Sequence, residues 1–206
     1  ACPRSGQELI DYLRAGPTNA DVQNREVRET LSLNQYNELF AKLPKLIQQD
    51  VQDRWGEPDH DPAFLSDRAA FALPLARFDN IMVGIQPARG YNIDPTDTYH
   101  SPDLVPPHNY FAFYFYLREV FGVHAIAHMG KHGNMEWLPG KALALSEQCY
   151  PEAVFGPTPH LYPFIVNDPG EGAQAKPFDF SALATLWRSL VARSITAFRC
   201  AVSPIA

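Results

Sequence analysis

The stretch HAIAHMGKHGNMEWLPGK, residues 124–141, organises the chain. Three histidines and one glutamate recur in it at steps of four residues. Imidazole and carboxylate are ligands typical of a divalent-metal site. On an α-helix these steps would place all four on one face, but two glycines and a proline disfavour that helix, each glycine by about 1 kcal/mol. The four candidate residues are His124, His128, His132 and Glu136.

A strand followed by a glycine-bent loop is therefore the structure that we predict for this stretch. The apolar run Val123–Ala127 has the form of a buried strand, which we expect to end near His128. His132 and Glu136 then project from the loop, with Trp137 as an apolar wall beside them. The pattern differs from the zincin motif because the glutamate follows the last histidine.

The roles predicted for these side chains differ. A lone buried histidine is usually an ordinary core residue, and we expect this of His124. Two lysines add positive charge on either side of the loop, and they are Lys131 and Lys141. The predicted metal ligands are His128, His132 and Glu136.

Composition narrows the classes of protein to consider. The chain has 206 residues, of which 46% are hydrophobic, enough to bury a core as one large or two small domains. Its net charge of -6 provides no basic surface for nucleic acid. No apolar run approaches the roughly 20 residues of a membrane span, and we expect no signal peptide. Three scattered cysteines fit a reducing cytosol, so we predict a cytoplasmic protein.

The first 78 residues are predicted to be mostly helix and loop. Gln7–Arg14 reads as a short helix, and Leu33–Gln52 reads as one amphipathic helix capped by Asn34. The acidic, turn-rich segment around His60 fits a solvated loop better than a cation site. The chain begins with alanine and not with an initiator methionine, which we interpret as a sign of a longer protein.

Three predicted strands each lead into a polar loop. Ile81–Ile85 precedes a loop with Arg89 and Tyr91, a second strand ends near His128, and Tyr162–Val166 precedes a glycine-rich loop. Ligands gather at the carboxyl ends of parallel strands, so we expect these loops to converge on one cleft. Arg89 suits a substrate carboxylate, and a structural ion pair is an equal alternative. The third loop adds Asn167, Asp168 and Glu171.

Between the first two strands lies a proline-rich segment, Asp94–His108, which we predict to be an ordered surface or lid. His100 and His108 would enter the site from it. Asn109 is predicted to cap an aromatic helix that ends at Gly122. Aromatic residues surround that helix, which indicates deep burial in the core, with a flat hydrophobic ligand beside it as the alternative.

The predicted fold class is α/β: short parallel strands with helices and long proline-rich ordered loops, in a segment of a larger multidomain subunit. Residues 1–78 would form a helical and loop portion, and 79–176 the core with the site. Residues 177–206 show helical spacing and are predicted to be a helical tail without function. Patterns that loosely suggest dinucleotide or phosphate binding, at 170–175 and 140–141, lack the helix or hydroxyl that such sites need.

Three long motifs carry a resemblance to a known family. They are QPARGYNIDPTDTYHSPDLVPPHNYFAFYFYLREVFG (86–122), HMGKHGNMEWLPGK (128–141) and YPFIVNDPGEGAQAK (162–176). The chain resembles the large subunit of aerobic cobaltochelatase, the CobN type, and more distantly the H subunit of magnesium chelatase. The resemblance is dense from about Asp79, looser upstream from about Leu33, and ends after Lys176. The chain would then be an internal segment of a subunit several times longer.

The resemblance implies insertion of Co²⁺ into a corrin precursor of the hydrogenobyrinic acid a,c-diamide type, in cobalamin biosynthesis. Separate AAA+ ATPase subunits would hydrolyse ATP, which this chain would not bind, and the rest of the large subunit would be a further partner. The magnesium chelatase branch implies an alternative, insertion of Mg²⁺ into protoporphyrin IX. The isolated segment is expected to be inactive.

Metal insertion needs ligands that hold a dication loosely and bases that accept the ring N–H protons. Glu136 and His132 are the catalytic residues that the resemblance implies. Positive and polar side chains would meet the arms of the macrocycle, and the aromatic helix could flank its plane. The implied substrate-binding residues are Arg89, Tyr91, His100, His108, Asn109, Lys131, Trp137, Lys141, Asn167, Asp168 and Glu171.

Two other functions stay open on the residues alone. In the first, the histidines bind zinc that activates water, which would make the chain a hydrolase. In the second, the segment is a scaffold or docking module whose histidines are satisfied in the core. Tight zinc with hydrolytic activity would favour the first, and a structure with His132 and Glu136 buried and pointing apart would favour the second.

Overall fold

The protein is described by a computed structural model. It describes residues 2–19, 21–22, 24–94, 101, 103–129, 134–140, 146–161 and 200–204, and of Asn134, Glu136 and Cys200–Pro204 it describes the backbone alone. The predicted division of the chain at residues 78 and 176 stays a prediction.

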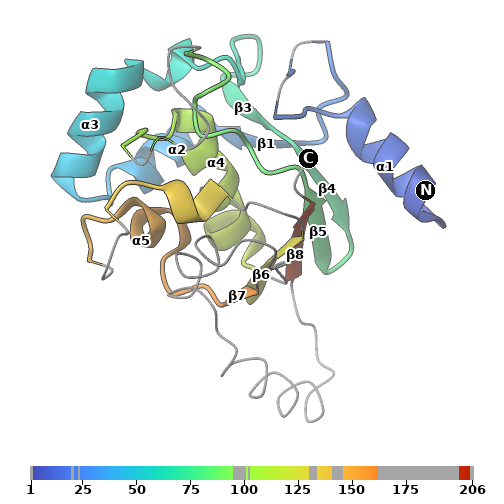
Figure 1. The fold of residues 1–206 in the computed structure, drawn as a ribbon. Coiled ribbons are helices and arrows are strands. Elements are labelled where there is room, and N and C mark those ends of the chain that lie inside the picture. The colour runs from blue at the N-terminus through green and yellow to red at the C-terminus, as the bar shows by residue number, and fades with distance from the viewer. Residues whose placement is uncertain are drawn as a thin grey trace.

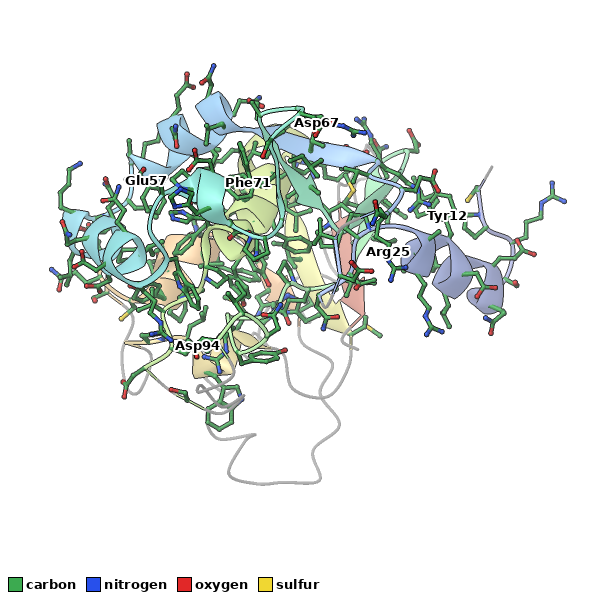
Figure 2. The ribbon with its side chains drawn as sticks, turned by 90° about the horizontal axis from the view of Figure 1, so that it is seen from above. Tyr12, Arg25, Glu57, Asp67, Phe71 and Asp94 are labelled. Atoms are coloured by element: carbon green, nitrogen blue, oxygen red, sulfur yellow. The ribbon has the colours of Figure 1, made fainter. Side chains whose placement is uncertain are left out.

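The first helix, α1 (Gly6–Ala15), projects from one side of the molecule (Figure 1). Ser5 accepts a hydrogen bond from the Glu8 backbone N–H and so caps its start, and the helix ends before Gly16. The helix predicted at this place is confirmed. Figure 2 shows Tyr12 where α1 leaves the body, and there the Arg28 guanidinium lies 3.8 Å from its ring centroid.

A small antiparallel sheet follows that the sequence analysis missed. It contains β1 (Glu29–Ser32), β2 (Phe64–Leu65) and β3 (Ala70–Leu73), with β3 in the middle. All four residues of β3 are buried, so the strand lacks the alternation of apolar and polar residues that would have revealed it. Phe71 of β3 lies in the interior (Figure 2).

The single helix predicted over residues 33–52 is wrong. The chain forms two helices, α2 (Leu33–Phe40) and α3 (Lys45–Trp55), separated by a turn. Pro44 lacks a backbone N–H and precedes the first residue of α3, which explains the break. Ser32, and not Asn34, caps α2 by accepting from the Gln35 N–H. A short 3₁₀ turn, η1 (Pro58–His60), follows, and His60 is exposed as expected for a solvated loop.

The larger sheet confirms the α/β class with short parallel strands. Its order is β4 (Leu75–Phe78), β5 (Ile81–Gly84), β8 (Cys200–Pro204), β6 (Ala125–Met129) and β7 (His160–Leu161). β4 pairs antiparallel with β5, and the other three pairings are parallel. The strand predicted to end near His128 is confirmed as β6.

The last described strand corrects the predicted helical tail. β8, drawn in red in Figure 1, lies between β5 and β6 and is hydrogen-bonded to both. For Cys200–Pro204 the helix prediction is therefore wrong. The other residues of the tail lie outside the described part of the chain.

The aromatic helix occupies the middle of the molecule. It begins as α4 (His108–Phe115), continues as a π-helical turn, η2 (Tyr116–Phe121), and ends at Gly122 in the left-handed conformation, as predicted. It packs against β3, α2 and α5 (Tyr150–Phe155), and its residues Tyr110–Leu117 are all buried. Deep burial in the core is confirmed. Asn109 does not cap this helix, because the cap position belongs to Pro107.

Candidate functional site

The structure describes part of the predicted site. It describes the side chains of Arg89, Tyr91, His108, Asn109, His128 and Trp137, and the backbone of Glu136. The remaining predicted residues lie outside the described part, and they are His100, Lys131, His132, Lys141, Asn167, Asp168 and Glu171.

A residue just after β5 and a residue near the end of β6 meet at one buried tyrosine of α4, whereas the convergence of the loops stays a prediction. Gln86, just after β5, donates from Nε2 to the Tyr114 hydroxyl at 2.7 Å. The same hydroxyl lies 3.1 Å from Nε2 of His128, near the end of β6. The carboxyl ends of two parallel-sheet strands are thus joined by a polar chain inside the core. The third predicted loop lies outside the described residues.

A pair of buried histidines extends this chain. His160 Nε2 lies 2.8 Å from His128 Nδ1, and the Phe155 ring packs against both imidazoles. Burial, reinforced by the neighbouring His160, lowers the pKa of His128 well below its usual value. The His128 ring is therefore held neutral. Sequence analysis missed His160, whose only signal is its position at the start of a short strand parallel to β6.

This geometry corrects the metal-ligand role predicted for His128. Both of its ring nitrogens are hydrogen-bonded, and the residue is 0% exposed. A neutral imidazole has one lone pair with which to accept a hydrogen bond or coordinate a metal. In this arrangement His128 joins β6 to the core, and the ligand role stays a prediction for His132 and Glu136. Within the described residues no three metal-ligating side chains gather.

The turn that carries Glu136 is a single turn of 3₁₀ helix, η3 (Asn134–Trp137). On one side of Glu136 the Met135 side chain is buried and accepts a hydrogen bond from the Tyr110 hydroxyl at 3.4 Å. On the other side Leu138 is buried as well. The predicted glycine-bent loop therefore contains a turn that is anchored in the core.

The end of this segment is also held. Gly140 has φ +83°, a conformation that favours glycine, and a Cβ there would lie 3.2 Å from Cys149. The Cys149 thiol donates to the Gly140 carbonyl at 2.7 Å, and the Tyr150 N–H donates to the Pro139 carbonyl at 3.2 Å. The backbone from Met135 to Gly140 is thus fixed at both ends.

Arg89 links this turn to the loop that follows β5. Its side chain is completely buried, and Nη1 donates to the Trp137 carbonyl at 2.6 Å and to the Ser101 carbonyl at 3.1 Å. These two acceptors are main-chain groups, whereas the sequence suggests a substrate carboxylate or an ion pair as the partner of Arg89. Tyr91 lies two residues further on and is half-buried.

Two predicted substrate-binding residues have structural roles instead. His108 is buried, with Nδ1 2.6 Å from the Tyr36 hydroxyl and Nε2 2.9 Å from the Gly56 carbonyl. A carbonyl only accepts, so Nε2 carries the proton and Nδ1 accepts from Tyr36. Burial lowers the pKa of His108, against the opposing effects of the Gly56 hydrogen bond and of Asp61. The prediction that His108 meets the substrate is wrong.

Asn109 is engaged with a buried carboxyl group. Its backbone N–H and its side-chain amide each donate to Asp61, both at 2.9 Å. Burial raises the pKa of Asp61, opposed by these bonds and by the one from Ala63. Asn109 thereby fixes the start of α4. The prediction for His124 is also wrong, because it is exposed in the connection between Gly122 and β6.

None of the helices in the described part of the chain has the length and apolar character needed to cross a lipid bilayer.

Comparison with known proteins assigns this α/β segment to a class. A sequence profile described as CobN/Magnesium Chelatase matches residues 1–177. The chain therefore belongs to the CobN/magnesium chelatase family. This agrees with the resemblance seen in the three motifs and with its end near Lys176.

Particular relatives are cobaltochelatase subunits. The chain is 68% identical over 174 residues to the aerobic cobaltochelatase subunit CobN of Sinorhizobium sp. It is 53% identical over 177 residues to that of Pseudomonas aeruginosa. Each match covers 84% of this chain and 14% of the relative.

A solved structure has the same fold. The catalytic subunit of cobaltochelatase from Mycobacterium tuberculosis aligns with a TM-score of 0.69 and 39% sequence identity. The alignment covers 83% of this chain and 15% of that chain. The chain thus spans about one seventh of the length of these relatives, a match of 14% for the first of them.

Proposed function

We propose that this chain forms the metal-insertion site of a cobaltochelatase large subunit, which transfers Co²⁺ into a corrin-type macrocycle. The observation that carries the proposal is the anchored turn of Glu136, which lies in the segment that follows β6 and is bonded to the loop after β5. The relatives at 68% and 53% identity are named as cobaltochelatase subunits, which favours Co²⁺ over Mg²⁺.

Metal insertion requires two things of the site: it must hold the metal loosely, and it must accept the ring protons that the metal replaces. A closed cage of four protein ligands would retain the ion, so two ligands, His132 and Glu136, suit a metal that must leave. The Glu136 carboxylate also accepts a ring N–H proton as the metal enters. Because neutral imidazole is the ligand form, metal loading weakens as pH falls below about 6.5.

The remaining predicted residues form the proposed contacts with the macrocycle. Lys131 and Lys141 flank the metal-binding loop and suit carboxylate or amide arms. Separate AAA+ subunits supply ATP hydrolysis, and the rest of the large subunit completes the site. Further contacts are proposed for Tyr91, His100, Trp137, Asn167, Asp168 and Glu171.

The test is Glu136→Gln in the full-length large subunit, assayed with its ATPase subunits. Loss of a general base costs about 10²–10⁴-fold in rate, so we expect Co²⁺ insertion to fall by that factor. Macrocycle binding, followed by fluorescence quenching, should persist. Glu147→Gln is the matched control, because Glu147 is exposed in a loop outside the proposed site. Normal turnover in Glu136→Gln would remove Glu136 from the mechanism.

A second variant tests whether His132 binds the metal. His132→Ala should weaken Co²⁺ binding measured by calorimetry, and an unchanged affinity would place the ion elsewhere. If the protein binds one equivalent of zinc tightly, hydrolyses a substrate and does not bind the macrocycle, the alternative function of a zinc hydrolase is favoured. Binding of neither metal nor macrocycle would favour the scaffold module.

A further inference from the structure

The buried guanidinium of Arg89 is placed to act on the backbone of the site. It follows β5 by a few residues and is 0% exposed. Through one nitrogen, Nη1, it bridges the carbonyl of Ser101 and the carbonyl of Trp137. The second of these belongs to the residue immediately after Glu136.

We infer that Arg89 is a positioning residue that fixes the Glu136 turn and acts on metal insertion through that turn, without touching the macrocycle. The inference rests on the proposed function of Glu136. It replaces the direct contact with a substrate carboxylate that the sequence suggested.

The turn needs an external support. It is one turn of 3₁₀ helix, and the backbone bond at its end, from the Leu138 N–H to the Met135 carbonyl, is long at 3.3 Å. Such a short helix has little stability of its own. The Tyr110 hydroxyl donates a hydrogen bond to the thioether sulfur of Met135, which is a weak acceptor.

The hydrogen bond from Arg89 to the Trp137 carbonyl is of a stronger type, because its donor is charged. Hydrogen bonds with one charged partner are roughly twice as strong as neutral ones. At 2.6 Å it is also shorter than the other described polar contacts of the turn. This guanidinium therefore holds the backbone next to Glu136 more strongly than the Tyr110 hydroxyl holds Met135.

Arg89 is itself held in a fixed place. Gly90 has φ +112°, and a Cβ there would lie 2.5 Å from the Trp55 ring, so the backbone passes directly over that indole. The N–H groups of Ile93 and Asp94 both donate to the Gly90 carbonyl, which closes a tight turn. Trp55 in turn donates to the Val105 carbonyl at 2.8 Å. The support of the Glu136 turn thus reaches back to helix α3.

Small displacements matter in such a site. A misplacement of about 1 Å at a catalytic group can cost about 100-fold in rate. Removing Arg89 should therefore slow the chemical step and leave the affinity for the macrocycle largely unchanged. A direct contact with the macrocycle predicts the opposite pattern.

The experiment compares Arg89→Met and Arg89→Lys in the full-length subunit with its ATPase partners. We expect the kcat of Co²⁺ insertion to fall about 100-fold in Arg89→Met, with KM for the macrocycle unchanged. Arg89→Lys should retain intermediate activity, because an ammonium can reach one carbonyl but does not reproduce the planar fork. Hydrogen exchange of the peptide over 134–138 should become faster in Arg89→Met, a result that does not depend on activity.

Arg118→Met is the matched control. Arg118 also bridges two main-chain carbonyls, those of Ala153 and Val154 at 3.3 and 2.8 Å, but it holds α5. Arg118→Met should lower the free energy of unfolding. It should leave both the hydrogen exchange over 134–138 and the kcat of Co²⁺ insertion at their wild-type values.

Two results would overturn the inference. A rise in KM that accounts for the whole loss in Arg89→Met would make Arg89 a substrate contact. Unchanged kcat and unchanged exchange would show that the turn does not depend on it. Glu136→Gln, measured alongside, separates the two proposals: full activity of that variant refutes the proposed function, whereas its inactivity combined with normal Arg89→Met refutes only the positioning role.

Discussion

At the scale of single residues, the core depends on neutral histidines with defined partners. His108 connects Tyr36 of α2 with Gly56, and His128 connects Tyr114 of α4 with His160. For both, burial lowers the pKa below the usual value. Protonation inside the core would place a charge in a poorly solvated position and would remove one hydrogen-bond acceptor.

The lowered pKa of His108 predicts a loss of stability in acid. The unfolded chain binds a proton at His108 below about pH 6.5, whereas the folded chain does so only at a lower pH. The stabilising contribution is therefore complete above about 6.5 and is lost as pH falls, by up to about 1.4 kcal/mol per pH unit. Chemical unfolding between pH 7.5 and 5.5 measures it.

His108→Gln is the comparison for this measurement, because the amide keeps a donor for Gly56 but does not titrate. The free energy of unfolding of the variant should change less with pH than that of the wild type. His128 is present in both proteins, so its contribution cancels. Equal pH dependence in the two proteins would contradict the assignment of His108 as a buried neutral group.

At the scale of elements, the larger sheet depends on strand β8. Its residues pair with Ile81–Val83 on one side and with Ala125–Met129 on the other. Removing β8 would separate β4 and β5 from β6 and β7. Gln86, which follows β5, and His128 of β6 both contact Tyr114, and β8 lies between these two strands.

The substitution Val202→Pro tests the role of strand β8. Val202 is paired with both Val83 and Ala127, and proline would remove an N–H from the middle of the sheet. A buried polar group that loses its partner costs about 1–3 kcal/mol, and we expect the free energy of unfolding to fall by at least this amount. Val202→Thr, which keeps the N–H and the β-branched shape, should be milder. If the wild type, Val202→Pro and Val202→Thr unfold at the same urea concentration, the sheet does not depend on β8.

At the scale of the whole molecule, the chain matches one part of much longer cobaltochelatase relatives. It spans 14% of the length of its cobaltochelatase relatives. Turnover needs a metal site, a binding surface for the macrocycle and a connection to ATP hydrolysis. We propose that this chain holds the metal site, and that the remaining subunit and its partners supply the other two.

The isolated chain is therefore expected to be inactive even when ATP and the ATPase subunits are supplied, whereas we expect the full-length subunit to insert Co²⁺ under the same conditions. Circular dichroism first establishes that the isolated chain is folded. Insertion is then followed by the absorbance of the macrocycle. Turnover by the folded, isolated chain would contradict this division of labour.

Local patterns in the sequence determined several features of the protein. The ends of α1 and of the aromatic helix, the burial of that helix and the strand before His128 follow from periodicity and from glycine and proline chemistry, which act over a few residues. The three long motifs indicated the family. The break at Pro44 was readable too, but the apolar spacing on both sides of it suggested one continuous helix.

Only the tertiary structure decided what the buried polar side chains do. His108 meets partners 72 and 52 residues away, His128 meets His160 across 32 residues, and Arg89 meets the Trp137 carbonyl across 48. No local pattern encodes such pairings, because a buried donor takes whichever acceptor the packed chain brings within reach. The sequence thus identified the residues capable of chemistry, and the packing around α4 decided which of them support the fold.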